Sequence, residues 1–358
     1  MPTDDGPLFE RLRQKTVQAI APKLRLENSR DGLYLPLLDL HLDPQNSVKN
    51  AFISHAHADH GAAMRVSPDP GAPVPELRLA SPETAALLRA RYGDTHPIRV
   101  LAWEETIELG PARVRIAPAG HILGAAALVV ESDDGTLVYT GDIKPGAGLT
   151  HRAAELPKCD VLVIESTFGL PIFSFPSDAE NHEAMVAFAR EAIADGKTPV
   201  FLAYALGKGQ EIAQLLGSNG IAVRAHGAMT KLNEVYREHG VALPLVRPYD
   251  KDDKEGPAAL IVPPRDRFGA MFKKGRNAGI RVAIVSGWAL LDSSRERYDA
   301  DAQIPLSDHA SFSELDRLVE GCAPKRVIVT HGYAQSYARY LRKRGMLADA
   351  IDAPGYEA

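Results

Sequence analysis

The chain of 358 residues is poor in cysteine, has only 6% aromatic residues and lacks any long apolar run. Two cysteines, Cys159 and Cys322, are too few for a disulfide framework, and we expect each to be a small buried residue rather than a metal ligand. No segment reaches about 18 consecutive apolar residues, so none is expected to span a membrane. Residues 1–10 carry acids and a proline where a secretory signal needs a basic start and an apolar run. We therefore expect a cytoplasmic protein.

An excess of positive charge is also missing, because the formal net charge is −5. This balance excludes indiscriminate attraction to polyanions, so any nucleic-acid contact must come from local patches, to which bound divalent cations would add. With 45% hydrophobic and 24% charged residues, the composition is that of a globular protein. The length predicts about two domains, or one domain inserted into another.

The first half of the sequence is typical of β structure. Short apolar runs between glycine, proline and acidic turns predict strands at Asn50–Ser54, Arg113–Ala117, Ala127–Glu131 and Leu137–Thr140. A hairpin turn is predicted at residues 133–135. Good helix formers after a serine and a proline predict a helix at Pro82–Tyr92.

From about Pro176 the pattern changes to alternating helices and strands, which predicts a small parallel α/β domain. The predicted elements are a helix to about Ala194, a strand at Pro199–Ala203, a helix from Gly207, and strands at Ile221–Ala225, Ala258–Val262 and Arg281–Ser286. The charged stretch Tyr249–Glu255 is interpreted as a solvated loop. The resulting prediction is a first domain part at 1–175, an inserted domain at 176–300 and a second domain part at 301–358.

Residues 55–60 place three imidazoles and a carboxylate within six positions after a strand. Side chains two apart at a strand end can grip one ion, while those around the following turn can reach a second. Further candidates each follow an apolar run and lie beside a glycine, which permits the unusual dihedrals of a ligand-bearing loop. The predicted ligands are His55, His57, Asp59, His60, His121, Asp142 and His331.

The ligand types predict two divalent metal ions, zinc or manganese. His55, His57 and His121 form one site, Asp59, His60 and His331 the other, and Asp142 bridges them. Such a pair would hold a hydroxide and stabilise the entering and leaving oxygens at phosphorus, which predicts hydrolysis. Asp43 and Glu165 are candidate partners for the second nitrogens of ligating histidines.

The motif His-x-His-x-Asp-His with a later histidine and aspartate resembles the metallo-β-lactamase family. Residues 164–169, 307–311 and 329–332 resemble, in order, three motifs of its β-CASP nucleases. The resemblance implies an α/β fold, namely a metallo-β-lactamase αββα sandwich with an inserted α/β β-CASP cap domain. It also implies catalytic roles for Asp59, for Glu165 as the residue that orients a histidine, and for His309 as the general acid.

Several stretches are similar to bacterial ligase-associated DNA exonucleases, over about residues 30–345: Asp31–Tyr34, His41–Pro44, Glu165–Pro171, Tyr204–Lys208 and Ala225–Gly227. This similarity implies digestion of single-stranded DNA from an end, 5′ to 3′, in DNA repair, together with an ATP-dependent DNA ligase and a helicase. An RNA-processing nuclease is the alternative, since the histidine of the third motif, His331, resembles the residue that RNA-processing enzymes of the group have there. A thioester or lactam hydrolase would leave Glu165, His309 and the insertion without a role.

Nucleic-acid strands are held by phosphate contacts and by base stacking on aromatic faces. Candidates beside predicted strand ends or motifs are Ser166, Thr167, Lys144, Lys208, Tyr204, Ser286 and Trp288. Packing within the cap is an equal interpretation for the two aromatic residues. Basic residues at 339–344, and Arg11, Arg13 and Lys15 on an expected N-terminal helix, are interpreted as solvated faces.

Overall fold

The computed structural model describes residues 24–67, 69, 71–94, 96–249, 256–264 and 279–351. The expected N-terminal helix with Arg11, Arg13 and Lys15, the residues 1–10, and all of the predicted loop 249–255 except Tyr249 lie outside the described residues. Among the helices that are described, none has the length and apolarity needed to cross a bilayer.

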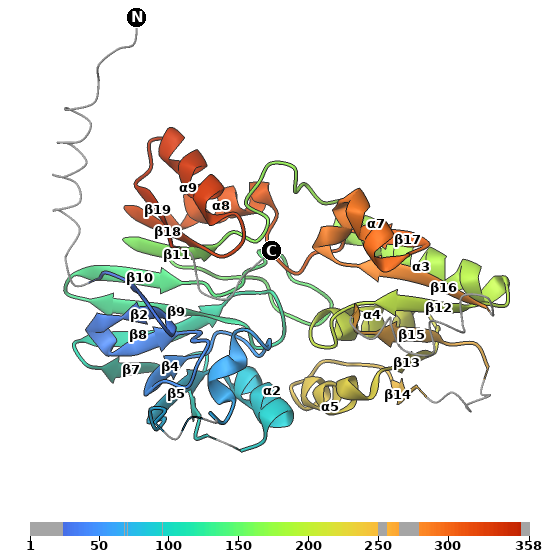
Figure 1. Ribbon diagram of the computed structural model, residues 1–358, viewed down its shortest axis with the longest axis horizontal. Helices are drawn as coiled ribbons and strands as arrows, with labels where there is room; N and C mark the ends of the chain where they lie inside the picture. The colour runs from blue at the N-terminus through green and yellow to red at the C-terminus, as the bar shows by residue number, and fades with distance from the viewer. Residues whose placement is uncertain are drawn as a thin grey trace, which may run out of the picture.

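Two β-sheets stack face to face in one part of the molecule (Figure 1). This part is formed by the first and the last segments of the described chain. Across the first sheet the strands are β1 (Glu27–Ser29), β2 (Gly32–Leu35), β3 (Leu40–Leu42), β4 (Asn50–Phe52), β5 (Leu77–Ala80) and β6 (Arg99–Val100). Across the second they are β19 (Ala348–Ile351), β18 (Arg326–Thr330), β11 (Val161–Glu165), β10 (Gly135–Tyr139), β9 (Ala126–Ser132), β8 (Ala112–Pro118) and β7 (Thr106–Leu109).

The packing of β11 explains why this strand is apolar up to its last residue, Glu165. Val161 and Val163 point into the core between the two sheets, whereas Leu162 and Ile164 face the helices outside. The helices α2 (Pro82–Tyr92), α8 (Phe312–Cys322) and α9 (Ala334–Lys343) cover the outer faces (Figure 1). The layers are therefore helix, sheet, sheet and helix, which confirms the predicted αββα sandwich.

A third, entirely parallel sheet forms the cap. Its strands, in order, are β14 (Arg247–Pro248), β13 (Val223–Ala225), β15 (Ala259–Val262), β12 (Thr198–Leu202), β16 (Ile280–Val285) and β17 (Ala302–Ile304). The helices of this part are α3 (Asp178–Ala194), α4 (Lys208–Ser218), α5 (Thr230–Glu238) and α7 (Asp292–Tyr298). Short 3-10 helices occur at η1 (Pro36–Leu38), η2 (Gly61–Met64), η3 (Gly227–Met229) and η5 (Gly287–Leu290).

The chain leaves the sandwich after β11 and returns to the same sheet at β18. These strands are parallel neighbours, with Glu165 opposite Thr330, although the whole cap lies between them in sequence. Because the carboxyl ends of neighbouring parallel strands meet at one edge, the loops after β11 and β18 lie side by side. The insertion of the cap at this edge, as predicted, brings cap residues onto the loops that carry the candidate ligands.

Candidate metal centre and active site

Every predicted ligand lies in a loop just after a strand. His55, His57, Asp59 and His60 follow β4, His121 follows β8, Asp142 follows β10 and His331 follows β18. His121 and His331 have φ angles of 54° and 56°, in the left-handed region that residues other than glycine seldom adopt. Strain of this kind persists only where surrounding contacts impose it, and it is frequent at functional sites.

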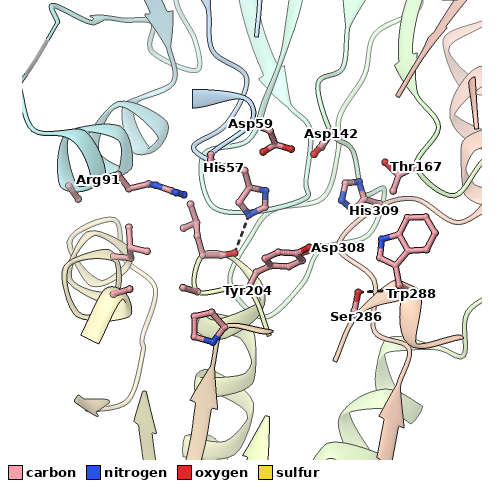
Figure 2. Close-up of a pocket in the computed structure, with 18 of the residues that line it drawn as sticks. His57, Asp59, Arg91, Asp142, Thr167, Tyr204, Ser286, Trp288, Asp308 and His309 are labelled. Atoms are coloured by element: carbon pink, nitrogen blue, oxygen red, sulfur yellow. Dashed lines mark hydrogen bonds between the residues drawn. The ribbon is translucent and has the colours of Figure 1, made fainter. Parts of the chain in front are cut away.

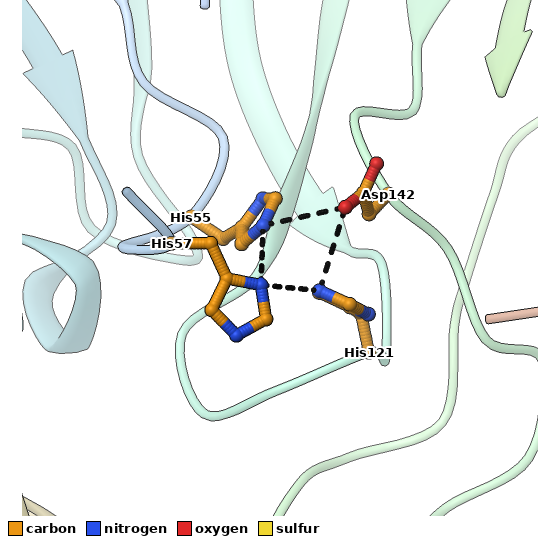
Figure 3. A group of neighbouring side chains, drawn as sticks. All are labelled: His55, His57, His121 and Asp142. Carbon is orange, nitrogen blue, oxygen red and sulfur yellow. Dashed lines mark hydrogen bonds and ion pairs between the residues drawn. The ribbon is translucent and has the colours of Figure 1, made fainter. Parts of the chain in front are cut away.

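His55, His57, His121 and Asp142 form a tight group (Figure 3). Nδ1 of His57 lies 3.1 Å from Nε2 of His55 and 3.1 Å from Nε2 of His121. Oδ2 of Asp142 lies 3.5 Å from Nε2 of His55 and 3.6 Å from Nε2 of His121. The four candidate ligand atoms all lie within 4.8 Å of one another.

The outer contacts of this group determine which ring nitrogens can bind a metal. Nε2 of His57 donates to the backbone oxygen of Leu206 at 3.1 Å, and Nδ1 of His121 donates to that of Asp308 at 2.8 Å. The nitrogens that face each other therefore carry lone pairs, which repel unless a cation lies between them. Two nitrogens bonded to one zinc at about 2.0–2.1 Å stand roughly 3.3 Å apart in a tetrahedron. The spacing and the donor types thus fit a divalent ion.

The protonation states of these histidines agree with metal binding. Burial lowers the pKa values of His55 and His57, and it lowers the pKa of His121 to about 3. All three rings are therefore neutral near pH 7, the state in which imidazole acts as a ligand.

Asp59, His60 and His331 form a second, more open group. Nε2 of His60 lies 3.4 Å from Oδ2 of Asp142 and 3.9 Å from Oδ2 of Asp59, whose side chain is 43% exposed. The ring of His331 stacks on that of His60 with 5.6 Å between centroids. The same oxygen of Asp142 thus faces both groups, as a bridging ligand requires.

Asp43 is buried behind His60 and accepts four hydrogen bonds. Its Oδ2 accepts from Nδ1 of His60 at 2.8 Å, from Oγ of Ser54 at 2.6 Å and from the hydroxyl of Tyr139 at 2.7 Å. Its Oδ1 accepts from the backbone N–H of Ser54 at 2.7 Å. This network fixes the orientation of His60 and leaves its Nε2 directed toward Asp142.

His309 lies on the other side of Asp142 and is paired with Glu165. Nδ1 of His309 lies 2.7 Å from Oε1 of Glu165, which is only 2% exposed. Burial alone would lower the pKa of His309, but the carboxylates of Glu165 and Asp142 raise it to about 10. His309 therefore holds a proton near neutral pH, which suits a general acid.

A cleft of about 770 Å³ opens between the sandwich and the cap beside these groups (Figure 2). His57, Asp59, Asp142 and His309 line it from the sandwich, and Tyr204 and Trp288 line it from the cap. Tyr204 is 59% exposed, so its ring is accessible from the cleft. A cavity of this size suits a ligand larger than a single ion.

The residues predicted to contact nucleic acid fall into two sets. Four of them line the cleft, namely Thr167, Tyr204, Ser286 and Trp288. Ser166 is buried and donates to the backbone oxygen of His331 at 2.7 Å. Lys144 is buried against Asp178, with Nζ and Oδ2 2.8 Å apart. Lys208 is 1% exposed, and its Nζ lies 3.8 Å from Glu211 and 3.9 Å from Asp308. The structure therefore does not bring these last three to the cleft, and the phosphate contacts predicted for them have no support in this arrangement.

Four features of the site were not predicted from the sequence. The backbone oxygens of Leu206 and Asp308 fix two of the candidate ligands. Arg91 and Lys231 line the cleft from α2 and α5. Leu206 and Asp308 lie in the stretches 204–208 and 307–311 quoted above, but a backbone oxygen carries no residue signature. Arg91 and Lys231 lie on ordinary helices, where no local motif marks them.

Comparison with protein families identifies two domains in this chain. Residues 35–191 match the beta-lactamase superfamily domain, and residues 301–352 match the Zn-dependent metallo-hydrolase RNA specificity domain. The two matches lie on either side of most of the cap, in agreement with the topology of the sheets.

Relatives come from DNA and RNA metabolism. A probable DNA ligase of Opitutus terrae is 38% identical over 322 residues, covering 89% of this chain and 30% of that protein. Ribonuclease J of Sinorhizobium meliloti is 26% identical over 354 residues, covering 84% and 61%. An RNase J-like protein of Methanocaldococcus jannaschii is 28% identical over 191 residues, covering 48% and 44%. The chain thus spans less than two thirds of each relative. With its two domain matches and these relatives, the chain belongs to the metallo-β-lactamase superfamily and, within it, to the β-CASP group.

Proposed function

We propose that this protein is a metal-dependent DNA exonuclease that hydrolyses phosphodiester bonds from the end of a single strand, 5′ to 3′, in DNA repair. In this proposal residues 1–175 and 301–358 make up the catalytic domain, and residues 176–300 make up the cap that closes over the substrate.

The pairing of His309 with Glu165 beside Asp142 is the observation that carries the proposal. Phosphodiester cleavage expels an alkoxide, a poor leaving group that benefits from a proton donor. Glu165 binds Nδ1 of His309 at 2.7 Å and keeps the imidazole protonated, so that the ring delivers its proton from Nε2 to the leaving oxygen. Glu165 is held in turn by the backbone N–H groups of Ile143 and Thr167, at 3.0 and 2.9 Å.

Two divalent ions, zinc or manganese, complete the site in this proposal. His55, His57 and His121 hold one, Asp59, His60 and His331 hold the other, and Asp142 joins both, while Asp43 orients His60. When bound, such ions supply Lewis acidity that activates water and offsets charge at phosphorus. The exposed carboxylate of Asp59 lies in the cleft, which assigns it to the reacting centre as well.

The cleft also offers groups that suit a single strand. The rings of Tyr204 and Trp288 can stack on bases, and the hydroxyl of Ser286 can donate to a phosphate oxygen, whereas the hydroxyl oxygen of Thr167 is buried. Stacking on aromatic faces does not depend on base identity, which suits an enzyme that digests a strand of any sequence.

DNA is favoured over RNA in this proposal because the similarity to the probable DNA ligase extends over 89% of this chain. That relationship also favours an ATP-dependent DNA ligase as a functional partner, and the sequence resemblance adds a helicase. Both partners would act on the same broken or processed DNA ends.

RNA processing is the second candidate function. It is favoured by the match of residues 301–352 to an RNA specificity domain and by the relatives named as ribonucleases. An RNA enzyme of this design would use the same metal ligands and the same acid, and it would prefer strands with 2′-hydroxyl groups.

The decisive experiment uses single strands of DNA and matched RNA, each labelled at the 5′ or the 3′ end, with manganese, with zinc or with a chelator. We expect the 5′ label to be released from DNA as a mononucleotide first, and no cleavage with chelator or in the His309→Ala variant. His239→Ala changes an exposed histidine outside the cleft and serves as the matched control. Cleavage of RNA alone would favour the second candidate, and cleavage of neither strand with either metal would overturn both.

A further inference from the structure

Arg91 and Lys231 give one wall of the cleft a positive charge. Both residues line the cleft and are exposed. Within the described part of the chain, neither cation forms an ion pair with a carboxylate. Many other basic residues are paired, for example Arg113 with Glu131 at 2.8 Å and Arg326 with Asp349 at 2.7 Å.

The two cations come from different parts of the molecule. Arg91 lies in the last turn of α2 in the sandwich, and Lys231 lies in the first turn of α5 in the cap. These helices pack side by side (Figure 1), and Leu88 of α2 belongs to the same apolar cluster as Leu232 of α5. The two charges therefore share one wall where the sandwich meets the cap.

Arg91 is also fixed relative to the candidate metal centre. Its Nη1 donates to the backbone oxygen of Ala56 at 2.9 Å, between the ligands His55 and His57. In Figure 2 Arg91 and Trp288 stand at opposite sides of the cleft, with His57, Asp59 and Asp142 between them. The reacting centre thus separates a cationic wall from an aromatic one.

We infer that Arg91 and Lys231 form a phosphate clamp that binds the backbone of the DNA strand on the side of the reacting centre opposite Trp288. This inference rests on the proposed function. With a net charge of −5 the whole molecule does not attract DNA, so the attraction must be local, from the side-chain cations of the cleft together with any divalent ions bound there. A strand whose bases stack on Trp288 and Tyr204 would pass the acid His309 and then meet the clamp.

The clamp distinguishes strand binding from chemistry. Phosphate contacts position a strand without reading its bases, so loss of the clamp weakens all sequences alike. A variant that lacks the clamp also releases fewer counterions when it binds the strand, so its affinity depends less on salt. Each neutralised phosphate contributes about 0.7 to the slope of log Kd against log salt for a single strand.

The test measures fluorescence anisotropy of a labelled oligothymidylate with protein in chelator, so that the strand is bound and not cleaved, over a series of NaCl concentrations. We expect Arg91→Gln and Lys231→Gln each to reduce the slope by about 0.7, and the double variant to reduce it by about twice that amount. Arg339→Gln removes an exposed charge on α9 outside the cleft and should retain the wild-type slope.

Two further measurements keep the outcomes separate. Arg91→Lys keeps the charge without the planar guanidinium, so it should retain the slope even if the contact with Ala56 is weakened. Thermal unfolding of each variant identifies any that fail to fold. Wild-type slopes in both glutamine variants would overturn the clamp and leave the proposed function standing. A wild-type protein that does not bind the oligothymidylate even at the lowest salt concentration would overturn the clamp, whereas the proposed function is tested separately by cleavage of the labelled strands with metal.

Discussion

Nδ1 of His309 lies 2.7 Å from Oε1 of Glu165, although the two residues are 144 positions apart in the sequence. Glu165 ends β11, just before the chain enters the cap, and His309 follows β17, just after the chain leaves it. The pair therefore joins the two ends of the insertion, and its geometry depends on correct docking of the cap. The proposed general acid and the placement of the cap are therefore coupled through this contact.

The proposed role of His309 as a general acid predicts a dependence on the leaving group. His309→Ala should lower kcat on ordinary DNA by about 10²- to 10⁴-fold, because the leaving alkoxide needs a proton. With bis(p-nitrophenyl) phosphate the loss should be much smaller, since nitrophenolate leaves without protonation. Steady-state rates on the two substrates check this. Equal losses on both would assign His309 to metal or substrate binding instead.

The four hydrogen bonds of Asp43 predict a specific effect on metal affinity. Asp43→Ala removes the acceptor of His60 Nδ1 and should weaken binding of one of two ions by about 10- to 100-fold. Titration calorimetry with zinc, followed by metal analysis after dialysis, measures this. Tyr139→Phe is the matched control, because it removes another hydrogen bond to the same oxygen and leaves the contact with His60 in place. An equal loss in both variants would mean that general destabilisation is the cause.

The loop that carries His121 has no room for a side chain at Gly120. Its φ is +75°, and a Cβ atom there would lie 1.9 Å from the backbone oxygen of Lys144. Gly120→Ala should therefore displace His121 and cost several kcal/mol, well above the roughly 1 kcal/mol expected from the positive φ alone. Gly220 has the same φ of +75° with nothing within 4 Å of its Cβ position, so Gly220→Ala isolates the backbone cost. Urea unfolding of the two variants gives the comparison.

The local part of the fold could be predicted because local rules determine it. The helix at Pro82–Tyr92 was predicted with its observed bounds, since Ser81 caps it and Gly93 ends it. The strand predicted at Asn50–Ser54 ends at Phe52. The prediction of a strand was wrong for residues 53 and 54, because the backbone N–H of Ser54 donates to the carboxylate of Asp43.

The helix α8 was not predicted, although its signal is present. Oε2 of Glu314 accepts hydrogen bonds from the backbone N–H and from the hydroxyl of Ser311, each at 2.8 Å, which closes the first turn of the helix.

The candidate ligands could be predicted because histidine and aspartate at strand ends are residue types that bind metals, so the residue type itself indicates the function. The burial of Lys144 and Lys208 could not be predicted, because the sequence around a lysine does not indicate whether its side chain faces solvent or a carboxylate. Glu211 lies three residues after Lys208 on the same helix, but only the docking of the cap brings Lys208 near Asp308. The same docking brings Arg91 and Lys231 to one wall, which no sequence spacing indicates.

Glu211 predicts a loss of stability in acid. Its side chain is 3% exposed, with Oε1 3.3 Å from Nε2 of His182 and Oε2 3.8 Å from Nζ of Lys208. Burial would raise its pKa, but the Lys208 ammonium, the hydrogen bond from His182 and the nearby charges of Lys144 and His151 lower it to about 2, from an ordinary 4.5. A lowered folded-state pKa means that the stabilisation is fully present above pH 4.5 and disappears as the pH falls toward 2.

Wild-type protein in chelator should therefore lose about 3 kcal/mol of unfolding free energy across this window through Glu211. Glu211→Gln should be less stable at pH 7, since Lys208 loses one of its two buried carboxylate partners, and its stability should fall less steeply in acid. Glu183→Gln on α3, an exposed glutamate next to His182 in sequence, is the matched control. Urea unfolding at a series of pH values measures all three proteins. If wild type and Glu211→Gln fell in parallel, the contacts of Glu211 with Lys208 and His182 would contribute nothing to the loss of stability in acid.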